Sequence, residues 1–418
     1  MPTRIGLRLA ATLAVTVLLG ACTGGDRSPS APASPSGTAT PDALAVYRAI
    51  AADVAGIREL DPPERADPRI IDAEQLRANL EAEFDETNPP ERILVAERID
   101  KALGLLPADA SLRALSLDFQ GSQVIGYYDP SVDELFLVSR SGSLGPTERA
   151  TYAHEFTHQL QDRHFDLESL GLEDATDEGD RALAVLGLVE GDAVSVQTSW
   201  MTASLGATEL AEIVAAAADP EVLAVIGRTP AILLEAAMFP YQTGAAFVSE
   251  LLAGRGYGAV DAAYARPPAS TEQVLHPAKY RSGERPLDVM VPADLATRFG
   301  SGWRLDAQDT LGELQLRVWL REGGVAGDVA RVAAEGWGGD RLGLLAAPAG
   351  DGDLVVLVTE WDTTADAREF GEAATAAVAG YGPTGSVVAA GRRVVVGIGS
   401  AEPARARFAA ILEALAAD

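Results

Sequence analysis

The sequence contains little cysteine, histidine or lysine, and these shortages narrow the chemistry available to it. In 418 residues there are one cysteine, Cys22, four histidines and two lysines. A single cysteine cannot form a disulfide within the chain, and a thiolate-rich zinc cluster needs several cysteines. Any metal site in this chain must therefore use histidine and carboxylate ligands.

Positive charge is also scarce. The chain has 33 basic and 61 acidic residues, which give a net charge of −28 at pH 7. Such a chain is repelled at long range by nucleic-acid phosphates and anionic headgroups, so we expect no nucleic-acid partner. The 47% hydrophobic content is enough for two or three folded cores and excludes a disordered chain.

The N-terminus has the pattern of an export signal. Arg4 and Arg8 precede an apolar run, residues 9–19, which is too short to span a bilayer. Small residues follow, which predicts a signal peptide over residues 1–21. The sequence LGAC that ends at Cys22 resembles the bacterial lipobox, in which the cysteine carries a lipid. The alternative is an incidental or buried cysteine.

The next segment is typical of a flexible tether. Residues 22–40 are small, polar and interrupted by proline, with nothing to bury. Loss of the signal peptide would remove two arginines and no acidic residue, leaving a net charge of −30. We therefore expect an extracytoplasmic protein, anchored by lipid to the bacterial cell membrane.

The hydrophobic periodicity changes along the chain. Alternation predicts a β-hairpin over 124–128 and 134–138. Apolar spacings of three and four predict helices at 41–60, 73–84, 91–105, 147–163 and 177–200. The segment 210–253 is also helical in pattern, but charged residues interrupt it, so we expect no membrane span there.

The C-terminal part has a different texture. Strand-forming runs are expected at 341–346, 353–359, 386–390 and 392–398, with helices at 364–379 and 402–416. This order predicts a small ββαββα domain. The fold class is therefore α+β: a mainly helical domain with a small hairpin over 41–299, and an α+β domain of unknown role over 300–418.

The strongest motif is HEFTH, which lies within a predicted helix. Because helical residues four apart share a face, His154 and His158 can bind one ion. Neutral imidazole suits zinc, the ion lowers the pKa of its water, and Glu155 is placed to take the proton as general base. The alternative is a surface helix with two solvated histidines.

A catalytic zinc normally takes three protein ligands, so a third must be found. His164 lies six residues after His158, as in metzincins, but that pattern needs a glycine where Gln161 stands. If the helix continues, His164 points about 240° away from His158. Glu190 lies in an apolar run, where a carboxylate needs a partner such as a cation. We favour Glu190, the alternatives being His164 as ligand or Glu190 as a solvated side chain.

Several further residues are candidates for supporting roles. Asp192 is a possible acceptor for a ligand histidine. His276 precedes a proline that ends a short predicted helix, and it is either a proton donor to the oxyanion or a structural histidine. Tyr128 and Tyr280 are weaker candidates for the same task. The strand 134–138 is placed to bind an extended substrate as an edge strand, or is an ordinary half-buried strand.

Three segments together resemble a known group. They are HEFTHQLQD at 154–162, LVEGDA at 188–193 and STEQVLHPAKY at 270–280. These resemble a group of bacterial, often lipid-anchored, predicted zinc metallopeptidases of the gluzincin type, the class that includes thermolysin. The resemblance covers about residues 120–285 and leaves the region after residue 300 unassigned.

The resemblance implies a role for each matched residue. Glu155 would be the general base, and Ala278 departs from the group's usual HPEKY. Zn²⁺ would be held by three ligands: His154, His158 and Glu190. The second motif also departs from thermolysin, in which an aspartate follows the glutamate by four residues.

These observations predict a membrane-anchored zinc peptidase that hydrolyses peptide bonds of a peptide or protein substrate with a zinc-activated water. One alternative is a non-catalytic surface lipoprotein that binds a partner, with zinc absent or structural. Another is zinc-dependent amide hydrolysis on cell-wall peptides, which the high negative charge mildly disfavours. Substrate specificity and oligomeric state do not follow from the sequence.

Overall fold

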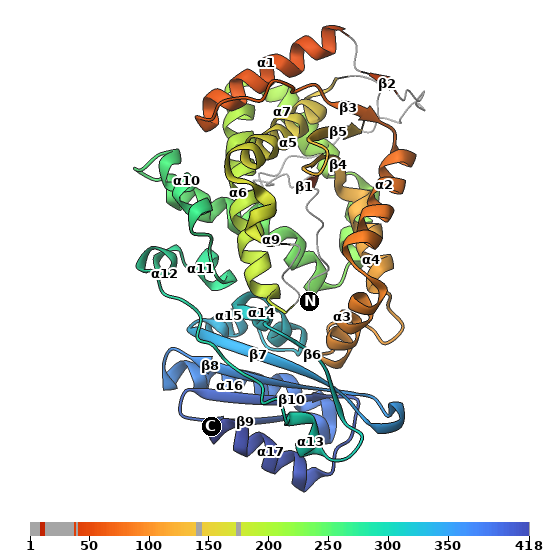
Figure 1. Ribbon diagram of the computed structural model, residues 1–418, viewed down its shortest axis with the longest axis vertical. Coiled ribbons are helices and arrows are strands. Elements are labelled where there is room, and N and C mark those ends of the chain that lie inside the picture. The colour runs from red at the N-terminus through yellow and green to blue at the C-terminus, as the bar shows by residue number, and fades with distance from the viewer. Residues whose placement is uncertain (1–8, 13–36, 39–40, 139–143, 173–176, 418) are drawn as a thin grey trace.

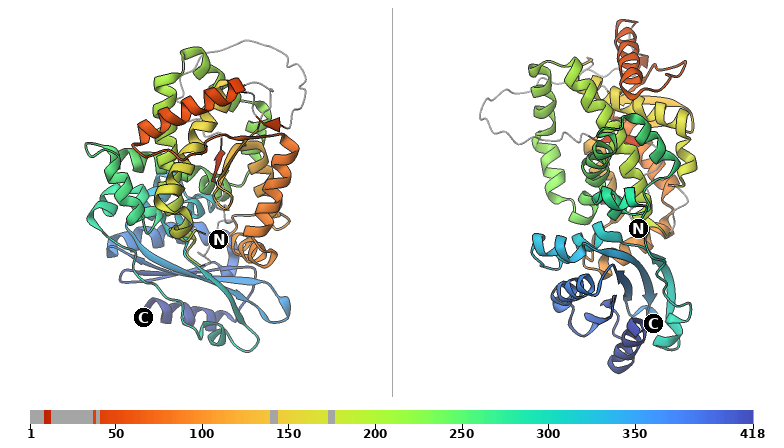
Figure 2. Two further views of the ribbon diagram at one scale, coloured as in Figure 1. Left: turned by 45° about the horizontal axis from the view of Figure 1, so that its top comes forward. Right: turned by 90° about the vertical axis from the view of Figure 1, so that its left-hand side faces the viewer.

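The computed structural model describes residues 9–12, 37–38, 41–138, 144–172 and 177–417. Helices around a small sheet form an upper lobe, and a second sheet with its own helices forms a lower lobe (Figures 1 and 2). The fold is α+β, as the sequence predicts. Most of the predicted signal peptide and tether, including Cys22, lies outside the described residues.

The helices of the upper lobe follow the predicted pattern. They are α1 (Pro41–Arg58), α2 (Ala73–Thr87), α3 (Pro90–Ala102), α4 (Leu112–Gln123), α5 (Pro146–Phe165), α6 (Gly179–Ser204), α7 (Ala207–Ala217), α8 (Pro220–Arg228), α9 (Ala231–Leu252), α10 (Tyr257–Ala265), α11 (Thr271–Leu275) and α12 (Pro277–Ser282). Each helix predicted from periodicity is confirmed, with ends that differ by a few residues. Helix α4, which Ser111 caps through Ala114 N, was not predicted.

The upper sheet contains the predicted hairpin, but its second strand does not lie at the predicted edge. β4 (Val124–Asp129) and β5 (Glu134–Val138) pair antiparallel, and β3 (Arg69–Ile71) lies parallel to β5 on its other side. The strand 134–138 is therefore internal, and its prediction as an edge strand is wrong. The sequence did not reveal the three-residue strand β3, which covers that edge.

The outer positions of this sheet are taken by two short strands. β1 (Leu9–Thr12) pairs antiparallel with β4, and β2 (Gly37–Thr38) pairs antiparallel with β3. The strand order is thus β1-β4-β5-β3-β2. The side of β4 that faces away from β5 is therefore occupied by β1.

Helices α6 and α9 approach each other unusually closely. A Cβ atom on Gly244 would lie 2.1 Å from the Gly187 oxygen, and one on Gly191 would lie 2.3 Å from the Gly244 carbonyl carbon. Only glycine permits this backbone contact. Within the described residues, α9 alone is long and apolar enough by composition to cross a membrane, and 39% of its apolar window is buried inside the protein.

The lower lobe is a five-stranded antiparallel sheet with the order β6-β7-β8-β10-β9. Its elements are α13 (Leu295–Phe299), β6 (Arg304–Asp309), α14 (Gly312–Glu322), α15 (Gly327–Ala334), β7 (Trp337–Ala346), β8 (Asp353–Trp361), α16 (Thr364–Val378), β9 (Ser386–Ala390), β10 (Arg393–Gly399) and α17 (Arg405–Ala417). The predicted ββαββα order is confirmed from β7 onward. The elements β6, α14 and α15 precede it and were not predicted.

Both faces of the lower sheet are buried. In β8, Val355 and Leu357 pack with α14 to α16, whereas Leu354 and Val356 pack with α13 and α17 on the opposite face. Alternate residues of a strand point to opposite faces, so a sheet covered on both sides is apolar along its whole length. This explains the uninterrupted hydrophobic run in β8.

The two lobes share part of this core. Ile99 and Ala102 of α3 and Ile232 of α9 belong to the same buried cluster as the α14 to α16 face of the sheet. Arg98 of α3 also binds Asp353 at 2.6 Å. The contact between the lobes therefore combines apolar packing with an ion pair.

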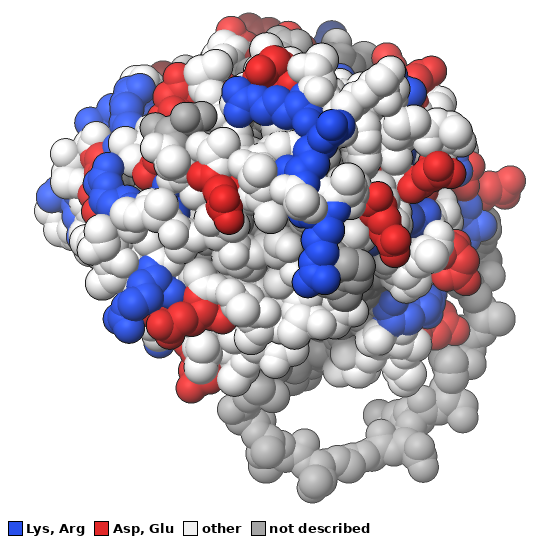
Figure 3. All heavy atoms as spheres, turned by 90° about the horizontal axis from the view of Figure 1, so that it is seen from below, with Lys and Arg blue, Asp and Glu red and all other residues white. Residues whose placement is uncertain are grey.

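Figure 3 views the molecule from the end of the lower lobe. Basic and acidic side chains are interspersed there, and a short row of basic residues crosses the middle with acidic residues on both sides. On this face, the described residues form no extended surface of one sign. The acidic excess of the chain is thus not concentrated at this end.

Candidate metal centre

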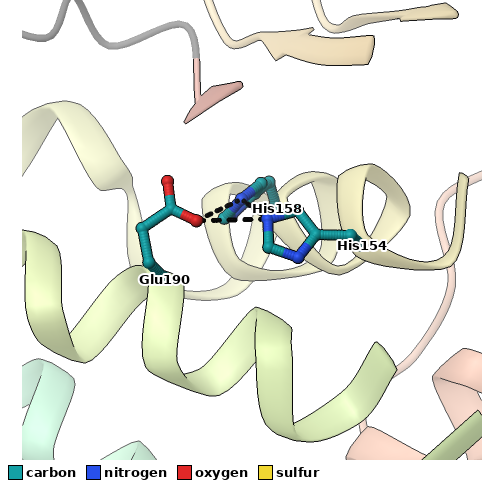
Figure 4. A group of neighbouring side chains, drawn as sticks. All are labelled: His154, His158 and Glu190. Atoms are coloured by element: carbon teal, nitrogen blue, oxygen red, sulfur yellow. Dashed lines mark hydrogen bonds and ion pairs between the residues drawn. The ribbon is translucent and has the colours of Figure 1, made fainter. Parts of the chain in front are cut away.

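Three predicted ligands lie together at the contact between α5 and α6. Glu190 of α6 points toward the rings of His154 and His158 on α5 (Figure 4). The Glu190 Oε2 atom lies 3.1 Å from His154 Nε2 and 3.4 Å from His158 Nε2, and the two Nε2 atoms are 3.1 Å apart. Each side chain is at most 2% exposed.

The local sequence explains why these side chains meet. Helix α5 begins at Pro146, after Gly145, and runs without a break to Phe165, so His154 and His158 share a face. Gly191 lets α9 press on α6 beside Glu190. Glycine in the LVEGDA motif is therefore explained by helix packing.

The imidazole of His158 is held from its other side by a glutamine. His158 Nδ1 lies 2.8 Å from Gln161 Oε1, and Gln161 Nε2 donates to Val189 O at 3.0 Å and to Asp192 Oδ2 at 3.1 Å. Gln197 of α6 lies close enough to His154 to influence its pKa, while its own Nε2 atom donates to Ala150 O at 2.9 Å. Metal-binding histidines generally have such a partner on the second nitrogen.

Asp192 is linked to a buried arginine from the first helix. Arg58 is fully buried and its Nε atom lies 2.9 Å from Asp192 Oδ1, while Tyr264 OH donates to Asp192 Oδ2 at 3.0 Å. The Arg58 guanidinium also lies 4.6 Å from the ring centre of Tyr257. Asp192 was predicted to contact a ligand histidine directly, and this is wrong: Gln161 stands between them.

The electrostatics of the group couple its three members. Burial raises the pKa of Glu190, but the two imidazoles outweigh it and lower that pKa to about 2. Burial lowers the pKa of His154. Burial also lowers the pKa of His158, but the carboxylates of Glu190 and Glu155 outweigh it and raise that pKa. Glu190 is therefore an anion whose charge is balanced by protons on the imidazoles or by a metal ion.

Glu155, the predicted general base, is buried next to the two histidines. It follows His154 on α5, is fully buried, and lies close enough to His158 to influence its pKa. A carboxylate in this position can hold a water molecule beside an ion bound by the two histidines.

The remaining predicted residues lie elsewhere. His164 is exposed and its Nε2 atom lies 2.9 Å from Asp61 O. His276 is not part of the ligand group, and its Nε2 atom lies 2.9 Å from Glu313 Oε1 in α14. Tyr128 OH donates to Asp162 at 2.8 Å, and Tyr280 OH donates to Arg266 O at 2.9 Å. The role of His276 as a proton donor stays a prediction.

The third motif instead joins the two lobes. Besides His276, it supplies Thr271, whose hydroxyl oxygen accepts from Leu314 N of α14 at 3.3 Å, and Lys279, which binds Asp362 of the lower lobe at 2.5 Å. Burial raises the pKa of Glu272 to about 7 even though Lys279 acts to lower it. These contacts give the STEQVLHPAKY motif a structural role.

The donor set of the upper cluster fits a zinc ion. The ligand atoms of His154, His158 and Glu190 lie within 4.8 Å of one another, and all three residues are buried. Two imidazole nitrogens and one carboxylate oxygen form a common donor set of catalytic zinc sites. These residues would hold the ion, with Gln161 fixing the ring of His158.

Three supporting residues were missed from the sequence. Gln161 lies three residues after His158, and Gln197 lies seven after Glu190, so helical spacing gave a signal for both. Arg58 lies about 100 residues before α5, and nothing in its local sequence indicates that it reaches the site. Only the packing of α1 against α5 and α6 reveals it.

Comparison with known proteins adds one match. Residues 298–407, which include the whole lower sheet, match a family described as "Domain of unknown function (DUF8575)". No curated protein and no solved structure matches the chain.

Proposed function

We propose that the protein is a zinc-dependent peptidase, anchored by a lipid on the outer side of a bacterial cell membrane. The observation that carries this proposal is the buried group of His154, His158 and Glu190, with Glu155 beside the first ligand. Among the described residues this group has three members, whereas structural zinc sites normally have four protein ligands. A site with three protein ligands leaves a position for water or substrate.

The chain's own residues supply the rest of the chemistry. A bound zinc ion polarises a substrate carbonyl and lowers the pKa of water. Glu155 accepts the proton of the attacking water and passes it to the departing amine. The burial of Glu155 and of the ligands lowers the local dielectric, which strengthens each of these interactions.

The neighbouring sheet supports a peptide substrate. β1 pairs antiparallel with β4, with Leu9 opposite Tyr128 and Ala10 opposite Tyr127, and it also contacts α5. An extended segment of chain is thus accommodated beside the helix that carries the HExxH motif. Addition of a strand to a sheet edge is a common mode of peptide recognition.

The anchor follows from the lipobox-like sequence at Cys22. If the signal peptide is removed before this cysteine, β1 leaves with it, and the edge of β4 is free to pair with a substrate.

The decisive experiment is Glu155→Gln. This variant should keep the zinc content of the wild type and lose peptide cleavage by at least about 100-fold, because only the proton acceptor is removed. Zinc content and cleavage of a quenched-fluorescent peptide library measure both effects. Full cleavage by the variant would contradict the mechanism. A zinc-loaded wild type that cleaves no peptide would favour a non-catalytic lipoprotein, and cleavage confined to cell-wall fragments would favour an amidase.

A further inference from the structure

The side chain of Gln161 has only one orientation that satisfies its surroundings. Its amide faces three groups: the Val189 carbonyl oxygen, the Asp192 carboxylate and the Nδ1 atom of His158. The first two can only accept hydrogen bonds. The NH2 group must therefore face Val189 and Asp192, which leaves Oε1 facing His158.

This orientation fixes the tautomer of His158. An amide oxygen only accepts, so His158 must carry its proton on Nδ1 and donate it across the 2.8 Å contact to Gln161. The neutral ring then has its lone pair on Nε2. That atom is the one that faces Glu190, at 3.4 Å.

Arg58 keeps this arrangement in place. The position of Gln161 depends on the Asp192 carboxylate, whose Oδ2 atom accepts from Gln161 Nε2 at 3.1 Å. The buried Arg58 guanidinium lies 2.9 Å from Asp192 Oδ1 and 3.0 Å from Asp192 Oδ2, which holds this carboxylate in place beside Gln161. A second arginine nitrogen binds Asp261 at 2.7 Å, which anchors the guanidinium.

We propose that Gln161 is a positioning residue that fixes the Nδ1–H tautomer of His158 and so leaves Nε2 able to bind the metal. Arg58 of α1 holds Gln161 in this orientation through Asp192. The metal-binding part of this inference rests on the proposed function. The tautomer does not, because the hydrogen bonds that set it belong to the chain alone.

The test uses the full chain labelled with 15N-histidine, together with zinc affinity from competition with a chromophoric chelator. With four histidines in the chain, the imidazole signals can be assigned by single substitutions. In the metal-free wild type at pH 8.5, His158 should be the Nδ1–H tautomer. Gln161→Met keeps the length of the side chain and removes the acceptor, so the Nε2–H form should appear and zinc affinity should fall about 10- to 100-fold.

A matched control lies two residues away. Gln159 is also buried in α5, but its Nε2 atom donates to Asp133 at 2.7 Å, away from the histidines. Gln159→Met should leave both the tautomer and the zinc affinity unchanged. Asp192→Asn, which offers Gln161 an NH2 group, should increase the Nε2–H form of His158.

The wild-type spectrum alone can overturn the proposal, even if a variant fails to fold. An Nε2–H tautomer of His158 in the wild type would contradict it, as would unchanged tautomer and zinc affinity in Gln161→Met. A correct tautomer in a chain that binds no zinc would leave the positioning of His158 intact and remove the proposed peptidase function.

Discussion

Two clusters in this molecule look alike as sets of possible ligands but differ in what balances their charge. In the upper lobe, Glu190 faces the imidazoles of His154 and His158. Between the lobes, three carboxylates also lie close together, those of Glu272, Glu284 and Asp362.

The second cluster already contains a cation. The Nζ atom of Lys279 lies 2.7 Å from Glu272, 2.8 Å from Glu284 and 2.5 Å from Asp362. An ammonium group at the centre satisfies the carboxylates and leaves no role for a metal ion. Imidazole nitrogens instead bind either a proton or a metal, so the first cluster remains able to exchange one for the other. Proximity of ligand atoms therefore identifies a metal site only when the charge within the group is also considered.

The largest expected difference between the clusters is in zinc binding. Glu190→Gln removes the anionic member of the first cluster, so zinc affinity should fall by more than about 100-fold. This loss should exceed the loss expected when a residue that only supports a ligand, such as Gln161, is replaced. Glu272→Gln should leave the affinity unchanged. Chelator competition on both variants measures this. Equal losses in the two variants would show that the clusters are not distinct.

Loss of Lys279 should lower stability and leave zinc affinity unchanged. Lys279→Met leaves the buried Glu272 carboxylate without its cation, which should reduce the free energy of unfolding by about 3 kcal/mol without changing zinc affinity. The control is Lys101→Met. Lys101 forms a pair with Glu97 four residues away on the same helix, which contributes only about 0.5 kcal/mol. Urea unfolding would measure both, and similar values would argue against a special role for Lys279.

The helix contact behind Glu190 offers a third comparison. Gly244→Ala would place a Cβ 2.1 Å from the Gly187 oxygen, so α9 must move away from α6. We expect a loss of about 1–3 kcal/mol in stability and weaker zinc binding, because α6 carries Glu190. In Gly227→Ala, the new Cβ meets nothing within 4 Å, and stability should be equal or slightly higher. Thermal unfolding with and without zinc distinguishes the two variants.

The smallest expected effect concerns pH. As the pH rises, the cluster around Lys279 should contribute less to stability, whereas zinc should bind the first cluster more tightly. Burial raises the pKa of Glu272 from 4.5 to about 7, so the folded state binds its proton more tightly than the unfolded state. Its contribution to stability is complete below pH 4.5 and is lost as the pH rises through 7. Zinc affinity should increase over the same range, because the imidazoles lose their protons.

Unfolding of the metal-free chain between pH 5.5 and 7.5 tests this response. The wild type should lose about 1 kcal/mol more than Glu272→Gln over this range. The charged groups around Glu272 are the same in both proteins; they include Lys279, His276, Glu284, Glu313 and Asp362. If the stability of the two proteins changed with pH in parallel, Glu272 would not be the group responsible for the pH dependence.

The sequence by itself determined most of the helices and strands and the three candidate ligands. Periodicity located most of the helices, the hairpin and the ββαββα order, because side-chain burial repeats every 3.6 residues in a helix and every two in a strand. The four-residue spacing of His154 and His158 is likewise a property of the helix alone. Glu190 was identified because a carboxylate in an apolar run needs a partner.

The tertiary structure decided which distant residues support that site. It covered the strand 134–138 with β3, paired His276 with Glu313, and brought Arg58 to Asp192 across 134 residues of sequence. No local pattern encodes these contacts, because each depends on how separate elements pack. Hydrogen bonds and charge pairs form only after packing has brought the partners together, so the three candidate ligands could be predicted from the sequence and the supporting contact of Arg58 could not.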